Sequence, residues 1–372
     1  MFSHSLSRES ASHPLLINSR LFFSKKNDKK RVQRLPKHLC CIIIIAIIII
    51  FLFLYPLFIS LLSSNNTHNY EIENLSAIDF DLDMAEVDFN VDRMTARTRI
   101  EIERTSFLSS FLKPKIEEGK FSYKQRKSFL GFDQVTVRVF LPNTFLNAIV
   151  NVSVIRPLGY YNPFLPFEWL SFYQEDVFFF DECRISTLNL FIKRGVSSVT
   201  GDILFGNYVV DDMIRIDAMK HKAVVSGKGV VLVRNCEYCD LNINQKNSVE
   251  LARLFSSNII VKSQGSSSIT TVVNTTIDFE QKGGELFVSL LQYGDVKINL
   301  DSKKLARIYL PTNFSGLIHS TANQNMISDI NDRFEGTSNM TTIEGSVSSS
   351  VIPLGESTLD ITSKGNIIVD LL

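Results

Sequence analysis

The chain has 372 residues, 39 basic and 39 acidic residues, a formal net charge of zero and five cysteines. This balance does not favour a nucleic-acid-binding protein, which would carry a strongly basic surface. The zero conceals two unlike parts. Residues 1–38 hold nine Lys and Arg against two acids (+7), which leaves −7 for the rest.

Residues 1–38 are rich in Ser, Lys and Arg and lack hydrophobic periodicity, which predicts a disordered tail. Its basic cluster lies just before an apolar run. Cys40 and Cys41 follow at the edge of that run, where S-palmitoylation occurs. The alternative is that both cysteines are simply small apolar residues in lipid.

Residues 39–62 contain no charged side chain over 24 positions, enough for a helix to span a bilayer. A cleaved signal peptide has a shorter apolar core and a small-residue cleavage site. The run therefore predicts an uncleaved signal anchor that spans the membrane once, with Pro56 near its far end.

The flanking charges predict the orientation of this anchor. The basic residues precede the run, and the first basic residue after it, Arg93, comes behind eight acidic residues. The positive-inside rule therefore predicts a cytoplasmic N-terminus and a type II topology in the plasma membrane or a secretory or vacuolar compartment.

Sequons for N-glycosylation agree with this topology, because all of them follow the apolar run. An ectodomain that crosses into the lumen would expose them to glycosylation. They predict a glycoprotein, with acceptors at Asn65, Asn74, Asn151, Asn274, Asn313 and Asn339.

Beyond an acidic stem, short segments alternate apolar and polar residues, as at 135–141, 148–155, 258–262 and 295–300. This period of two predicts half-buried strands separated by Gly-, Ser- and Asn-rich turns. The chain therefore reads as mainly β, with a stem and first β segment at 63–129 and a β-rich ectodomain at 130–372.

Proline is absent between Pro166 and Pro311, where Gly and Ser fill the turns. Stacked parallel coils need the backbone N–H at nearly every strand position, so they exclude proline. We therefore expect a β-sandwich-like part followed by a β-solenoid.

The stretch at 160–180 holds ten aromatic residues, and we expect a loop whose rings are buried between two β subdomains.

The strand that ends in Leu-Pro at 141–142, the segment "AIVNVSVI" and later strands such as "SVTGDILFGN" carry a family resemblance. Residues 130–372 resemble the adhesin-like DUF4097 family, which implies a repetitive β-solenoid and brings no catalytic residues. The repeated Asn-Gly turns of that family are missing. The layout of basic tail, anchor and stem is also similar to LEA-2-type membrane proteins.

Three cysteines follow the anchor: Cys183, Cys236 and Cys239. The C-x-x-C pair could serve as a redox motif or half a zinc site, but few histidines are available and no βαβ pattern surrounds it. We expect a structural disulfide, with Cys183 bonded to one member of the pair.

Asp79, Asp81 and Asp83 alternate with apolar residues, so they should share one face of a strand. That face could hold Ca²⁺ or be merely solvated, and we expect the latter because the pattern of an EF-hand loop is absent. No metal site and no cofactor are predicted.

No G-x-S-x-G, H-E-x-x-H or P-loop motif occurs. We therefore predict a non-enzymatic, adhesin-like ectodomain that binds a protein or glycan ligand outside the cytosol. One alternative is a glycan-acting enzyme with paired carboxylates in a cleft. Another is a LEA-2-like lipid-handling protein with an apolar cavity.

Overall fold

A computed structural model describes residues 41–50, 64–106, 113–125, 133–158, 176–289, 291–301, 304–329, 332–349 and 356–372. The chain divides into two units, residues 1–57 and 58–372. In the first unit, residues 41–50 form an α-helix. Among the described residues, no helix combines the length and hydropathy needed to cross a bilayer. Residues 39–40 and 51–62 of the predicted anchor lie outside the described ranges.

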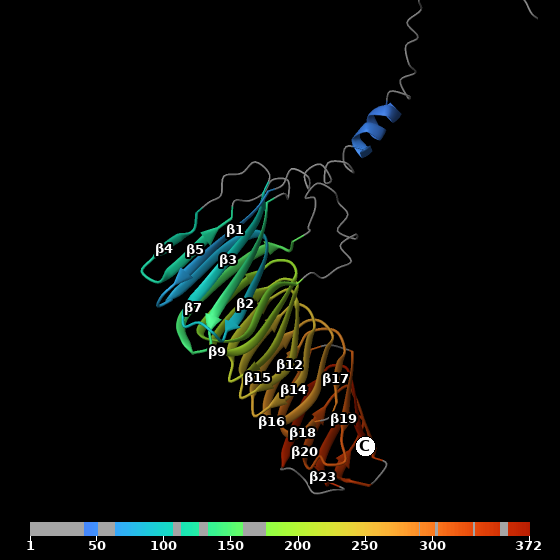
Figure 1. Ribbon diagram of the computed structural model, residues 1–372. Helices are drawn as coiled ribbons and strands as arrows, with labels where there is room; N and C mark the ends of the chain where they lie inside the picture. Colours follow the sequence, from blue (N-terminus) through green and yellow to red (C-terminus); the bar gives the residue numbers. More distant parts are fainter. Residues whose placement is uncertain are drawn as a thin grey trace, which may run out of the picture. The chain divides into compact units, whose positions relative to one another are not determined.

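The second unit is built from β-strands (Figure 1). Its first strands are β1 (Ser64–Ile72), β2 (Ala77–Asp92), β3 (Thr98–Ser106), β4 (Lys115–Glu117), β5 (Lys120–Lys124), β6 (Gln134–Pro142) and β7 (Leu146–Arg156). The next are β8 (Asp176–Ile192), β9 (Val196–Val210), β10 (Met213–Met219), β11 (Lys222–Gly227), β12 (Val230–Glu237), β13 (Asp240–Gln245), β14 (Val249–Phe255), β15 (Asn258–Ser263), β16 (Ser267–Gln281), β17 (Leu286–Val288), β18 (Leu291–Leu300) and β19 (Leu305–Leu310). The last are β20 (Gly316–Thr321), β21 (Gln324–Asp329), β22 (Phe334–Ser338), β23 (Thr342–Val347), β24 (Ser357–Ser363) and β25 (Asn366–Leu371).

From β7 to β19 the chain winds as a parallel β-solenoid, and Figure 1 shows these strands stacked in chain order along one axis. From β8 to β19, partners in neighbouring coils differ by 17 to 20 in residue number, as in Asn207 with Val224 and Leu286 with Ala306. A first sheet contains β7, β11, β13, β15 and β18, and a second contains β10, β12, β14, β17 and β19. The long strands β8, β9 and β16 bend and contribute to both sheets. The predicted solenoid is confirmed.

Alternation along each strand explains why these sequences stack. In β13, for example, Leu241 and Ile243 are buried while Asn242 and Asn244 are exposed. Inward-facing Val, Ile, Leu and Phe side chains of both sheets form one continuous core. Removing this apolar area from water is the main favourable contribution to folding.

Six turns from the second sheet to the first pass through a residue with positive φ. These residues recur at nearly the spacing of the coils: Glu182 (51°), Gly201 (139°), Lys220 (53°), Tyr238 (56°), Ser256 (48°) and Asn274 (49°). A left-handed residue reverses the backbone direction within a single position, so the strand resumes at once in the other sheet.

The sandwich-like first part that the sequence predicts does not form. Strand β2 pairs in parallel with β7 through residues 77–84 and with β8 through residues 87–89, so it belongs to the same stack. Antiparallel pairs also occur at this end of the stack, where β3 pairs with β1 and β6. Strands β5 and β6, which precede and follow the predicted boundary at residue 130, both pair with β2, while residue 130 itself lies outside the described ranges. Of the aromatic stretch, Phe178 and Phe180 lie in the core, and residues 160–175 lie outside the described ranges.

At the other end, the spatial order of the coils departs from the chain order. Strand β24 lies between β18 and β20, and β25 lies between β19 and β21, all parallel. The last coil is thus inserted between two earlier ones. Strand β23 then pairs antiparallel with β20, and β22 pairs antiparallel with β23.

Candidate functional site

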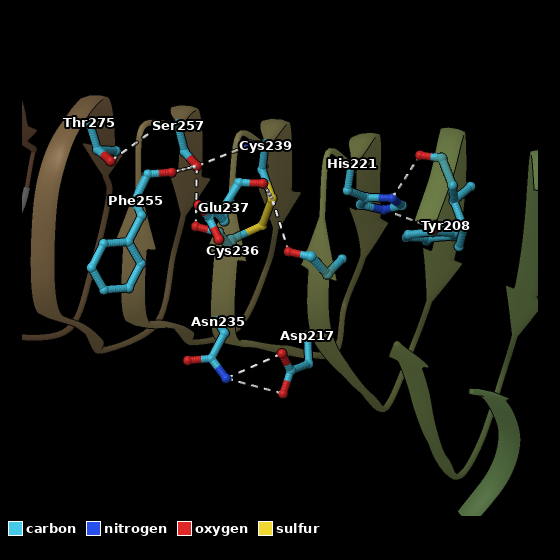
Figure 2. The surroundings of a disulfide bond; sticks show 12 residues. Tyr208, Asp217, His221, Asn235, Cys236, Glu237, Cys239, Phe255, Ser257 and Thr275 are labelled. Carbon is cyan, nitrogen blue, oxygen red and sulfur yellow. Dashed lines mark hydrogen bonds between the residues drawn. A yellow bond between two sulfur atoms is a disulfide. The ribbon is translucent and has the colours of Figure 1, made fainter. Parts of the chain in front are cut away.

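A disulfide joins Cys236, in β12, to Cys239, just before β13, and so closes the corner between the two sheets (Figure 2). Both cysteines are buried, and exposed Tyr238 lies between them at the positive-φ position. Cys183 remains a buried free thiol, so the expected bond between it and the C-x-x-C pair is wrong. Cys236 and Cys239 are bonded to each other, so neither sulfur is available to Cys183. Burial is the main cause that raises the pKa of the Cys183 thiol to about 12.

The sulfur of Cys239 occupies a position that hydroxyl groups fill in the next two coils (Figure 2). The Ser257 Oγ accepts from the Cys239 N–H at 3.0 Å and donates to the Phe255 carbonyl at 2.8 Å. The Thr275 Oγ1 accepts from the Ser257 N–H at 3.2 Å and donates to the Val273 carbonyl at 3.0 Å. These groups satisfy backbone atoms that the corner would otherwise leave unpaired inside the core.

We expect the disulfide to stabilise the corner modestly, because it closes a very short loop. Replacing Cys236 by Ala and Cys239 by Ser should lower the free energy of unfolding by about 2 kcal/mol. The Cys236→Ala/Cys239→Ala variant should lose about 1 kcal/mol more, because no hydroxyl then donates to the Glu237 carbonyl. Urea denaturation of both variants measures the difference. Equal stabilities of the two variants would contradict the interpretation that a hydroxyl group at position 239 can replace the sulfur as Ser257 and Thr275 do.

One coil earlier, the same corner contains a buried pair of rings, Tyr208 and His221. The Ile203 carbonyl can only accept, so the His221 Nδ1 donates to it at 3.1 Å. Nε2 is then the acceptor of the Tyr208 hydroxyl at 3.0 Å, and the imidazole is neutral. Gly206 makes room for the Tyr208 ring, since a Cβ there would lie 2.4 Å from the hydroxyl oxygen.

Protonation of His221 should make the folded protein less stable as the pH decreases. Burial lowers the pKa of His221 from 6.5 to about 4, so the unfolded chain binds a proton that the folded chain excludes. Its contribution is fully present above pH 6.5 and is lost as the pH falls towards 4, by about 2 kcal/mol between pH 7 and pH 5. Urea denaturation at both pH values should show a smaller loss in His221→Gln. An equal loss in both proteins would contradict this assignment.

The outward face of the first sheet holds a ladder of amides. Asn151, Asn189 and Asn207 are neighbours in register on β7, β8 and β9, and Asp79 of β2 precedes them. The Asn189 Nδ2 donates to the Asn151 Oδ1 at 2.7 Å, and the Asn151 Nδ2 donates to the Asp79 carboxylate. Because a carboxylate only accepts, Asp79 sets the direction of this chain of hydrogen bonds.

We call the outward positions of β7, β8 and β9 on this sheet the amide face. Its members are Ile149, Asn151, Ser153, Thr187, Asn189, Phe191, Phe205, Asn207 and Val209. None of them is charged. Phe205 is 57% exposed, and Ile149 and Phe191 are each 47% exposed. The face therefore combines central amides with flanking apolar groups that remain open to solvent.

The predicted glycosylation sites lie mainly in turns and at the edges of the sheets, whereas Asn151 lies in the amide ladder. Asn74 and Asn339 are exposed in turns, and Asn274 is an exposed corner residue. Asn313 lies in the turn after β19, and Asn65 lies in β1. Their modification stays a prediction, and the amide face described above requires Asn151 itself to be unmodified. Of the palmitoylation candidates, Cys41 is an exposed thiol in the helix and Cys40 lies outside the described ranges.

The acidic residues of β2 do not share one face. Asp79 and Asp81 point outward, but Asp83 is buried and receives a two-point ion pair from Arg156, at 2.5 and 3.1 Å. The strand bends here to pass from one sheet to the other, so residues 82–85 are all buried. Within the described ranges, no group of three or more His, Cys, Asp or Glu side chains is arranged to hold a metal.

Carboxylates also line surface hollows. Asp88 lies in a hollow of about 280 Å³ with Glu86 and Asp181, and burial raises its pKa while Arg138 opposes the shift. A larger hollow of about 590 Å³ near β20 and β24 contains Asp295, whose carboxylate accepts from the Thr358 hydroxyl at 2.6 Å. The sequence did not single out these residues, because strand alternation does not show which coils meet.

No family profile and no curated protein matches the chain. Solved structures similar to it include a candidate adhesin from Parabacteroides merdae, with 12% identity, a TM-score of 0.35, and coverage of 82% of this chain and 96% of that one. A candidate adhesin from Parabacteroides distasonis has 10% identity, a TM-score of 0.33, and coverage of 82% and 97%. A candidate cell adhesion protein from Clostridium sporogenes has 8% identity, a TM-score of 0.19, and coverage of 83% and 99%. At such scores the likeness carries no argument about function.

Proposed function

We propose that this chain is a single-pass, type II membrane protein whose β-solenoid ectodomain binds a ligand without chemical conversion. The observation that carries the proposal is the amide face, nine outward positions on three adjacent strands without a charge. Exposed apolar groups gathered on a sheet surface are typical of interaction sites.

The setting of this face supports binding. Its strands belong to a rigid parallel stack with a continuous core, so the side chains are held at fixed spacing. Rigid presentation lowers the entropy lost on association. The hollows near Asp88 and near Asp295 are lined largely by polar and charged residues, which is unlike the apolar cavity of a lipid-handling protein.

The proposed topology places this ectodomain outside the cytosol. The uncharged run at 39–62, the basic residues before it and the sequons after it support this placement. The Cys236–Cys239 disulfide adds support, because such bonds persist mainly in oxidising compartments.

The topology is tested by expressing the full chain in eukaryotic cells and comparing its gel mobility before and after endoglycosidase treatment. We expect a loss of mass equal to several glycans. An unchanged mobility, together with protease protection of the N-terminal tail instead of the ectodomain, would contradict type II insertion.

Binding is tested with cells that display the full chain, allowed to settle on immobilised proteins and polysaccharides and then detached by flow. Asn207→Lys adds a charge to the amide face, and we expect it to abolish adhesion. Thr362→Lys is the matched control, because it adds the same charge at an exposed position of β24 in the same sheet. Equal adhesion of both variants and the unaltered chain would contradict the proposal.

A further inference from the structure

We infer that the ligand of the amide face is a neutral glycan chain that lies across the strands, along the amide ladder. The inference rests on the proposed function and specifies the ligand class. It follows from three properties of the face: its lack of charge, its alternation of amide and apolar groups, and its regular spacing.

Electrostatics argue against an ionic ligand. The nearest charged outward side chains are Asp79 and Asp81 beside β7, Lys222 beside β9, and Lys193, which is exposed two positions after Phe191. Asp81 is paired with Lys124 at 2.6 Å and Lys222 with Asp240 at 3.0 Å, while Asp79 holds the amide ladder. A charged ligand on the amide column would therefore gain little from Asp81 or Lys222, and an anionic one would be repelled by Asp79, so Lys193 at the end of β8 is the one cation beside the face that this set does not pair.

The face combines amide groups, which can bind the hydroxyl groups of a sugar, with aromatic rings, which can pack against its C–H face. The Asn207 side chain is exposed, and its amide offers a donor and an acceptor to hydroxyl groups. Phe205 and Phe191 lie on opposite sides of the amide column and leave about half of each ring open to the C–H face of a sugar. A purely apolar ligand would leave the central amides unpaired, which costs free energy.

The spacing favours a polymer. Asn151, Asn189 and Asn207 recur at the distance between adjacent strands, about 4.8 Å. Asn242 continues the column beyond Val224. Because Asp79 fixes the direction of the hydrogen bonds, the ladder has distinct ends, and a glycan should bind in one polarity.

The test is a titration of the full chain, in nanodiscs, with neutral and anionic oligosaccharides of increasing length, at low and high salt. We expect affinity for a neutral oligosaccharide that rises with chain length and does not change with salt. Phe205→Ala and Asn207→Asp should each weaken binding by roughly three- to tenfold. Phe287→Ala, on the second sheet, and Asn244→Asp, on β13, are matched controls that should bind normally.

Salt-dependent binding of anionic glycans alone, or normal affinity of Phe205→Ala and Asn207→Asp, would overturn the inference. If adhesion under flow depends on Asn207 but no neutral glycan binds, the ligand class is wrong and the proposed function stands. If adhesion does not depend on Asn207, the proposed function itself fails.

Discussion

Replacing Arg333 by Met should lower the free energy of unfolding by about 3–5 kcal/mol. Arg333 is 3% exposed and donates to four carbonyl oxygens, those of Ser348 (2.8 Å), Leu372 (2.8 Å), Pro311 (3.1 Å) and Phe314 (2.8 Å). It therefore ties the inserted last coil to the turn that follows β19. Methionine fills a similar volume but cannot donate to these carbonyls, of which, within the described ranges, only that of Pro311 keeps another donor, the Phe314 N–H.

Urea denaturation measures this loss, and hydrogen exchange should show β24 and β25 opening first. Arg307→Met is the matched control, because Arg307 is about half exposed and pairs with Asp370 at the surface. It should cost less than about 1 kcal/mol. An Arg333→Met protein as stable as this control would contradict the role of Arg333 as the link between these segments.

Asp133→Asn should also cost about 3–5 kcal/mol, because it leaves the buried guanidinium of Arg104 without its counter-ion. The two side chains form two hydrogen bonds of 2.7 Å, and Arg104 is 4% exposed. The hydrogen bonds to the Asp133 carboxylate are the main cause that raises the pKa of Arg104. Gln125 joins this pair to β2, since it donates to the Asp133 carbonyl and accepts from the Asp83 N–H.

The loss is measured by urea denaturation against Glu73→Gln, which removes one partner of the exposed Arg97–Glu73 pair. That control should change stability by less than about 1 kcal/mol. A similarly small change in Asp133→Asn would show that the buried pair does not stabilise this end of the solenoid.

The strands and their parallel stacking could be predicted from the sequence because both depend on local features. Alternation in segments such as Leu241–Ile243 reveals one buried face, and the absence of proline after Pro166 reflects hydrogen bonds on both sides of each strand. The composition of the core follows from the same pattern, whereas its continuity does not, because the sequence predicts two β subdomains and the structure has one core.

The order of the last coils could not be predicted, because alternation is the same wherever a strand lies. Ile298 of β18 pairs with Ile361 of β24, 63 positions away, and nothing local indicates that β20–β23 lie beyond them. The bend that buries Asp83 also interrupts an otherwise regular alternation. The sequence predicts that this aspartate points outward, and only the ion pair with Arg156 shows otherwise.

The amide face could not be predicted from the sequence for a related reason. Asn151, Asn189 and Asn207 are separated by 38 and 18 positions, and the coil spacing is unknown until the register is known. In the sequence, Asn151 is recognisable as the acceptor of an N-x-S sequon but not as part of a ladder. A hand-built alignment of the coils at 18-residue spacing would have placed Asn189 beside Asn207, but the longer first interval would still have concealed Asn151.

The most direct test of ligand binding at the amide face is nuclear magnetic resonance of the side-chain amides of the full chain as ligand is added. We predict that the signals of Asn151, Asn189 and Asn207 shift together and saturate, while those of Asn244 and Asn258, exposed on β13 and β15, stay in place. Saturating shifts at other residues, with the three amide-face signals unchanged, would contradict the account.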